Sequence, residues 1–148
     1  MAMEVMMERV RDSAEAGAGP VRVLVVDDQA PFRVAAKAVI TRVPGFEWLA
    51  EATSGEQAVE LVDELSPALV LMDINMGAMD GLEATRLITA AHPQTVVFLV
   101  STYSPDDMPP AARTCGAAAY LNKDELSPRA IRLLWEAGGD PAWPLDVN

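Results

Sequence analysis

The feature of this sequence that most constrains its fold is a regular alternation of short apolar runs with segments of helical spacing. The apolar runs have strand length and cover residues 21–26, 46–52, 68–72, 95–100 and 117–121. Between and after them, apolar side chains recur every three or four residues, which is typical of amphipathic helices. Strands that are apolar along their whole length are buried on both faces of a parallel sheet. The sequence therefore predicts an α/β fold, a doubly wound sheet of five parallel strands with helices on both faces.

Capping residues mark where several of these helices begin. Ser54, followed three residues later by Gln57, forms a capping box that predicts a helix start. Ser127 as an N-cap, with Pro128 at the first helical position, predicts the start of the last helix. Asp80 is interpreted as the N-cap of the third helix rather than as a metal ligand.

The length of the chain allows one ordinary domain. Its 148 residues are too few for two domains of typical size, and its 51% hydrophobic residues are enough to form a core. A stretch rich in small residues that ends in Gly-Pro predicts a flexible N-terminal tail over residues 1–20. We therefore place the domain at residues 21–137, followed by a short C-terminal tail over residues 138–148.

Charge and cysteine content narrow the partners and the compartment. Lys plus Arg is 11 and Asp plus Glu is 22, so the net charge of −11 repels a phosphate backbone and nucleic acid is not a predicted partner. No run approaches the roughly 18 consecutive apolar residues of a membrane span, so no membrane partner is expected. The single cysteine, Cys115, excludes an internal disulfide. These observations favour a cytoplasmic protein.

Polar residues collect where the predicted strands end. Asp27 and Asp28 follow the first strand, Asp73 the third, Ser101 the fourth, and Lys123 follows the fifth by two residues. In an open parallel sheet, ligands bind beyond the carboxyl ends of the strands, so these side chains are expected at one edge. Convergence of three carboxylates is favourable only around a hard cation such as Mg²⁺. An ammonium and a hydroxyl could then hold a phosphoryl group that one carboxylate attacks.

With these motifs identified, the sequence resembles the receiver domain of two-component response regulators, in the branch that precedes helix-turn-helix output domains. The resemblance covers about 115 residues, and its motifs occur in the family's order and spacing. They are Val-Leu-Val-Val-Asp-Asp at 23–28, Leu-Met-Asp-Ile-Asn-Met at 71–76 with Asp-Gly at 80–81, Phe-Leu-Val-Ser at 98–101, and Gly-Ala-Ala-Ala-Tyr-Leu-Asn-Lys at 116–123. It implies the flavodoxin-like strand order 2-1-3-4-5.

The resemblance also implies roles for the acidic residues. Asp73 would be the phosphoacceptor and would share Mg²⁺ with Asp27 and Asp28. The backbone carbonyl of Asn75 would complete the protein's part of the coordination. The chain would not be an enzyme beyond self-phosphorylation from small phosphodonors and autodephosphorylation.

The signalling roles that the resemblance implies fall on three other residues. Ser101 would bond the phosphoryl group, Lys123 would pair with it, and Tyr120 would be the switch aromatic that moves with Ser101. From the residue alone, Tyr120 is equally consistent with core packing. The implied partners are a sensor histidine kinase, which phosphorylates the chain, and a downstream protein that reads its surface.

Four positions depart from the family pattern, and three of them, Gly77, Thr102 and Pro109-Pro110, favour an alternative function, whereas the branch tolerates the change at Asp124. Gly77 stands where proline is usual, Thr102 is bulkier than the usual alanine or glycine, and Asp124 replaces a common proline. Pro109-Pro110 falls in the presumed signalling helix, where it removes two backbone donors, so we expect a late, short or distorted helix. The alternative is a pseudo-receiver, a binding or dimerisation module that works without phosphorylation.

The sequence leaves open one further function, that of a hydrolase, and the role of two tryptophans. A phosphate-releasing hydrolase uses similar groups, but it usually needs a second acid near the nucleophile, and Asn75 occupies a position where that acid could stand. Trp135 and Trp143 either pack the last helix and tail onto the domain or form the face of a homodimer. The sequence does not decide between these two roles.

Overall fold

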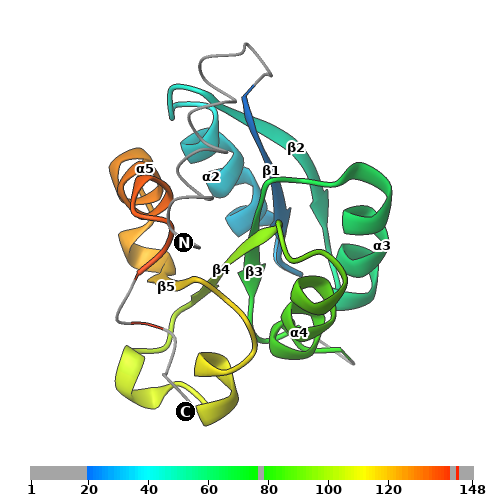
Figure 1. Ribbon diagram of the computed structural model, residues 1–148. Helices are drawn as coiled ribbons and strands as arrows, with labels where there is room; N and C mark the ends of the chain where they lie inside the picture. The colour runs from blue at the N-terminus through cyan, green and yellow to red at the C-terminus, as the bar shows by residue number, and fades with distance from the viewer. Residues whose placement is uncertain (1–19, 77–78, 141–142, 144–148) are drawn as a thin grey trace.

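The computed structural model describes residues 20–76, 79–140 and 143. Its centre is a five-stranded, all-parallel sheet in the order β2-β1-β3-β4-β5 (Figure 1). The strands are β1 (Val21–Val26), β2 (Phe46–Ala52), β3 (Leu69–Asp73), β4 (Val96–Ser101) and β5 (Ala119–Asn122). The predicted fold class and strand order are confirmed. β3 and β4 begin one residue later than predicted and β5 begins two later. Before β3 and β5 the apolar run continues into the preceding loop, at Ala68 and at Ala117 and Ala118.

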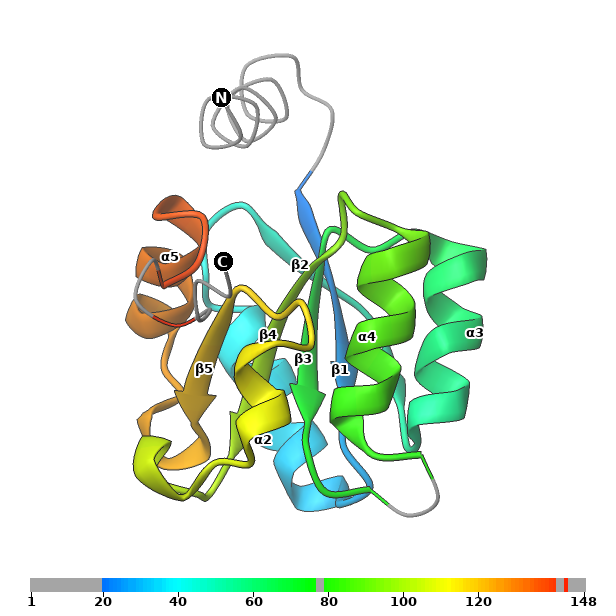
Figure 2. The same cartoon turned by 60° about the horizontal axis from the view of Figure 1, so that its bottom comes forward.

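Helices cover both faces of the sheet. They are α2 (Ala30–Ile40), α3 (Gly55–Leu65), α4 (Gly81–Ala91) and α5 (Pro128–Glu136). Figure 2 shows α3 and α4 side by side on one face, with α2 and α5 on the other. Each face has its own buried core, one containing Leu24, Met72 and Leu99 and the other Val25, Leu71 and Phe98. Neighbouring residues of a central strand thus point into opposite cores, which explains their uninterrupted apolar runs.

The predicted helix caps form. The Ser54 hydroxyl accepts from the backbone N–H of Gln57 at 3.1 Å, while the Gln57 side chain accepts from the N–H of Thr53 at 2.8 Å. The latter bond reaches one residue further back than the capping box predicts. Asp80 accepts from Glu83 N–H at 2.9 Å, and Ser127 caps α5. Each cap satisfies a backbone donor that the first helical turn leaves free.

The crossover between β4 and β5 departs from the pattern of the others. It contains two short 3₁₀ helices, η1 (Pro105–Asp107) and η2 (Pro110–Arg113), in place of a regular α-helix. This agrees with the distortion expected from Pro109-Pro110. A third 3₁₀ helix, η3 (Lys123–Glu125), follows β5 directly. The edge strand β5 is therefore covered by less helix than the central strands are.

The ends of the chain are described only in part. The predicted tail over residues 1–20 lies outside the described residues except for Pro20. Of residues 138–148, the structure describes 138–140 and 143, and the domain boundaries at 21 and 137 stay a prediction. In the described part of the chain, the helices are too short and too polar to span a bilayer.

Candidate functional site

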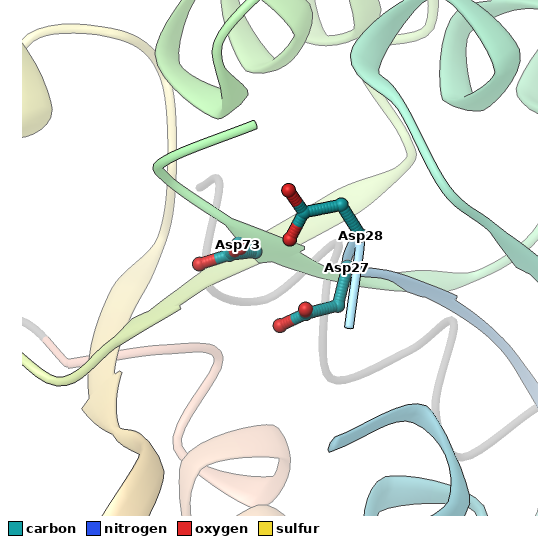
Figure 3. Close-up of side chains that lie close together, drawn as sticks. All are labelled: Asp27, Asp28 and Asp73. Atoms are coloured by element: carbon teal, nitrogen blue, oxygen red, sulfur yellow. The ribbon is translucent and has the colours of Figure 1, made fainter. Parts of the chain in front are cut away.

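Three aspartates converge at the carboxyl edge of the sheet. Asp27 and Asp28 follow β1, and Asp73 is the last residue of β3. Because β1 and β3 pair in parallel with Val26 opposite Met72, the residues that follow emerge together. One carboxylate oxygen from each aspartate lies within 4.8 Å of the other two, and Figure 3 shows the three side chains around a common space. The structure thus brings together the three carboxylates that the sequence predicts.

The three carboxylates differ in their exposure to water. Asp27 is fully buried and Asp73 is 5% exposed, whereas Asp28 is exposed. Burial and the nearby charge of Asp27 raise the pKa of Asp73 to about 6, although Lys123 acts in the opposite direction. A carboxylate at such a position is poorly solvated when it is ionised. A cation shared by the three groups would relieve this cost.

Lys123 reaches the same cluster from the segment after β5. Its Nζ lies 2.6 Å from Oδ2 of Asp27 and 3.5 Å from Oδ1 of Asp73. The same Nζ lies 4.5 Å from the centroid of the Phe32 ring, a cation–π contact. Lys123 therefore pairs most closely with Asp27, so Asp73 is the less neutralised of the two buried carboxylates.

The first turn of α2 fixes the loop that carries Asp27. The N–H of Gln29 donates to Oδ1 of Asp27 at 2.8 Å, and Arg33 donates to the Asp27 backbone carbonyl at 2.9 Å. Arg33 also pairs with Glu51 of β2 at 3.4 Å. Sequence reasoning missed Arg33 and Phe32, because helical spacing indicates only which residues of α2 face the core.

A second group of contacts connects the end of β4 to β5. Ser101 is 2% exposed, and its Oγ accepts from the backbone N–H of Tyr103 at 3.0 Å. The Tyr120 hydroxyl donates to the backbone carbonyl of Ser101 at 3.0 Å and also to that of Tyr103. Tyr120 is half-buried, and burial raises the pKa of its phenol, which keeps the hydroxyl a donor. The loop after β4 and the Tyr120 side chain thus form one hydrogen-bonded unit.

Tyr103 belongs to this unit although sequence reasoning did not single it out. Its hydroxyl accepts from the Asn75 side chain at 3.0 Å, and its carbonyl also accepts from Asn122 at 3.2 Å. Its side chain is 39% exposed in a loop, where apolar periodicity gives no information. The predicted role of Asn75, a metal contact through its backbone carbonyl, stays a prediction.

The loop between β3 and α4 is closed by a glycine. The N–H of Gly81 donates to the Ile74 carbonyl at 2.9 Å, and a Cβ at Gly81 would overlap the Asp73 backbone oxygen. Only glycine permits this close approach, which holds the start of α4 against the Asp73 backbone. Gly77 lies outside the described residues, and Thr102 is exposed beside Ser101.

Comparison with known proteins decides the family. The sequence profile of the response regulator receiver domain matches residues 23–134. The chain belongs to this family. Receiver domains are modules of two-component signalling systems rather than classical enzymes, so the site described above is that of a signalling protein.

Curated relatives of this receiver domain are longer regulators. It is 38% identical to the response regulator GacA of Pseudomonas protegens over 119 residues, which cover 78% of this chain and 55% of that protein. It is 34% identical to the nitrate/nitrite response regulator NarL of Escherichia coli over 120 residues, 80% of this chain and 55% of NarL. With the transcriptional regulatory protein DegU of Brevibacillus brevis it shares 35% identity over 104 residues, 70% of this chain and 44% of DegU. The chain spans about half the length of these relatives.

Solved structures give the same assignment. The response regulator domain of Thermotoga maritima CheB superposes with a TM-score of 0.72 at 30% identity, covering 82% of this chain and 99% of that one. A LuxR-family response regulator from Aurantimonas superposes with a TM-score of 0.73 at 28% identity, and the match covers 85% of this chain and 91% of that one. The predicted resemblance to receiver domains, and to the branch with output domains, is thereby confirmed.

Proposed function

We propose that this receiver domain is switched by phosphorylation of Asp73, with a histidine kinase as the phosphodonor and Mg²⁺ as the metal. The observation that carries the proposal is the convergence of buried Asp73 with Asp27, Asp28 and Lys123. Such a constellation binds both a hard cation and a phosphoryl group. The reading protein is a downstream partner, and the setting is the cytoplasm.

The donor atoms suit magnesium. Asp27, Asp28 and Asp73 offer carboxylate oxygens, the ligands that hard cations prefer. Asp28 is exposed, so water can complete a coordination shell on that side. When bound, the ion would neutralise charge on the carboxylates and on the phosphoryl oxygens.

Asp73 is assigned as the nucleophile because it is the less neutralised of the two buried carboxylates. One of its Oδ atoms forms a bond to phosphorus while the bond between phosphorus and the donor breaks, and the donor leaves with the electron pair. Lys123 lies 3.5 Å from Asp73 and is placed to pair with the transferred phosphoryl group. Asp27 keeps Lys123 oriented toward this position.

Ser101 is assigned to bond the transferred group, and Tyr120 to report the change. The Ser101 Oγ accepts a hydrogen bond from Tyr103 N–H and still has its own proton to donate. A shift of Ser101 or Tyr103 alters the two carbonyls that the Tyr120 hydroxyl contacts. Phosphorylation would thus bias two arrangements of this unit, which is how a local charge is read at a surface.

Mass spectrometry of the intact protein tests the proposal. Wild type incubated with acetyl phosphate and Mg²⁺ should gain one phosphoryl group, and omission of Mg²⁺ should prevent the gain. Asp73→Asn should gain nothing, whereas Asp106→Asn, which removes an exposed carboxylate from η1, should behave as wild type. A wild type that stays unmodified under these conditions counts against phosphorylation.

One observation favours a second candidate, a pseudo-receiver that binds partners or dimerises without phosphorylation. The β4–β5 crossover consists of two short 3₁₀ helices rather than a regular helix that could shift as a unit. This candidate requires that a partner bind wild type and Asp73→Asn with equal affinity, before and after treatment with the phosphodonor. A phosphorylation-dependent change in affinity would exclude it.

A further inference from the structure

Trp143 follows α5 and returns to the sheet, where it covers Tyr120. Its side chain is 4% exposed and belongs to the buried core on the α3 and α4 face. The indole stacks on the Tyr120 ring with centroids 5.5 Å apart and an interplanar angle of 30°. A residue outside the matched receiver segment of residues 23–134 thus contacts the side chain assigned as the switch.

The backbone after α5 is directed along this path by specific contacts. Gly139 has a φ of +114°, and a Cβ there would lie 2.6 Å from the Ala118 carbonyl oxygen. The N–H of Asp140 donates to that same carbonyl at 3.0 Å, just before β5. The N–H of Trp143 in turn donates to the Asp140 carbonyl at 2.9 Å. Glycine is therefore needed where the segment turns back, and the turn delivers Trp143 to β5.

Arg113 of η2 holds the indole from a second element. Its guanidinium carbon lies 4.4 Å from the centroid of the Trp143 ring, and its Nη1 donates to the Trp143 carbonyl at 3.1 Å. Figure 2 shows η2 in yellow beside β5, on the face covered by α3 and α4. Because the crossover forms only short 3₁₀ helices, no full helix within the described residues covers the side of β5 that carries Tyr120. The Trp143 side chain fills this position.

We propose that Arg113 and Tyr120 form a docking site for an indole, that Trp143 of the same chain occupies it, and that its docking is coupled to the state of Asp73. The inference rests on the proposed phosphorylation of Asp73. The Tyr120 ring contacts Trp143, while its hydroxyl contacts the carbonyls of Ser101 and Tyr103. Displacement of those carbonyls moves the ring and disrupts the stack.

Coupling of this kind is reciprocal. If occupation of the Asp73 site weakens the docking of Trp143, loss of Trp143 must change the affinity of the Asp73 site by the same factor. The buried indole N–H has no hydrogen-bond partner within the described residues, so stacking and the Arg113 contacts hold the side chain. Trp143 thereby shields Tyr120 from partners in the state that the structure describes.

Fluorine NMR on the chain labelled with 5-fluorotryptophan tests the coupling, because the three tryptophans lie in different surroundings. Trp135 packs edge-on against Phe46, and Trp48 lies under Lys37. Trp143→Phe assigns the signal of interest. Addition of Mg²⁺ and beryllofluoride, an analogue of the phosphoryl group, should shift or broaden the Trp143 signal and leave the Trp48 signal unchanged.

The fluorine signal of bound beryllofluoride reports occupation of the Asp73 site independently. Bound beryllofluoride with an unchanged Trp143 signal would overturn the coupling while leaving the proposed function intact. Absence of bound beryllofluoride would refute the proposed function and the coupling with it.

Two variants test the parts that the Tyr120 hydroxyl and Arg113 play in the coupling. Tyr120→Phe keeps the ring and removes the hydroxyl, so Trp143 should stay docked but lose most of its response to beryllofluoride. Arg113→Ala should move the Trp143 signal toward that of an exposed indole before any addition. A full response in Tyr120→Phe would show that the hydroxyl does not transmit the change, which contradicts the inference.

Discussion

Replacing Asp73 with asparagine should stabilise the metal-free protein at alkaline pH. Burial and the charge of Asp27 raise the pKa of Asp73 from 3.8 to about 6, so ionisation of this carboxyl opposes folding. A carboxyl with a raised pKa in the folded state contributes stability below its unfolded pKa, and this contribution is lost as pH rises through the folded pKa. A rise in the pKa of Asp73 from 3.8 to about 6 corresponds to about 3 kcal/mol of unfolding free energy that is lost when the carboxyl is fully ionised.

The expected gap in unfolding free energy between wild type and Asp73→Asn therefore depends on pH. Taking asparagine as a neutral replacement for protonated aspartate, Asp73→Asn should be more stable than wild type by about 3 kcal/mol near pH 8. Near pH 5, where most folded wild type is protonated at Asp73, the gap should fall to about 1.5 kcal/mol. Urea unfolding followed by circular dichroism in a chelating buffer measures both values.

Magnesium provides a second arm of the same experiment. Addition of Mg²⁺ near pH 8 should stabilise wild type by binding the native state and should stabilise Asp73→Asn less. Asp106→Asn controls for the removal of an exposed carboxylate. A gap between wild type and Asp73→Asn that is constant from about pH 5 to 8, or a variant less stable than wild type at the higher pH, would refute the electrostatic reasoning.

Substitutions at three further residues test the surroundings of the site. Lys123→Ala leaves buried Asp27 without its ammonium partner, so it should lower the unfolding free energy by about 3 kcal/mol, as measured by urea unfolding. The same variant should be phosphorylated more slowly by acetyl phosphate. Lys123→Arg serves as the charge-preserving comparison, and a wild-type phosphorylation rate in Lys123→Ala would contradict the assigned role. Gly81→Ala places a Cβ on the Asp73 backbone oxygen, so it should lower the unfolding free energy by about 2–4 kcal/mol and weaken Mg²⁺ binding. Unchanged stability and Mg²⁺ affinity would argue against the close approach of Gly81 to the Asp73 backbone. Phe32→Leu keeps an apolar side chain but removes the cation–π contact with Lys123, so it should lower the unfolding free energy by about 0.5–1 kcal/mol. A double-mutant cycle with Lys123→Ala should show coupling between the two residues.

The sheet and the convergence of the aspartates could be predicted because both depend on local patterns. Apolar runs define the strands, capping residues such as Ser54 and Asp80 define helix starts, and parallel strands bring their carboxyl ends to one edge. The distortion between β4 and β5 follows from the missing backbone donors of two prolines.

The detailed pairing at the site could not be predicted in the same way. The preference of Lys123 for Asp27 over Asp73 depends on distances that differ by less than 1 Å, 2.6 against 3.5 Å. The stack of Trp143 on Tyr120 joins residues whose sequence positions carry no shared pattern. The sequence left Trp143 open between packing on the domain and a homodimer face, and its burial in the structure favours packing.

The most direct test of the account identifies the residue that receives the phosphoryl group. Borohydride reduces an acyl phosphate to an alcohol and so converts a phosphorylated aspartate to homoserine. After treatment with acetyl phosphate and Mg²⁺, peptide sequencing by mass spectrometry should find homoserine at position 73 and aspartate at positions 27 and 28. Homoserine at Asp27 or Asp28, or a phosphorylated protein that yields no homoserine at position 73, would contradict the assignment of Asp73 as the phosphoacceptor.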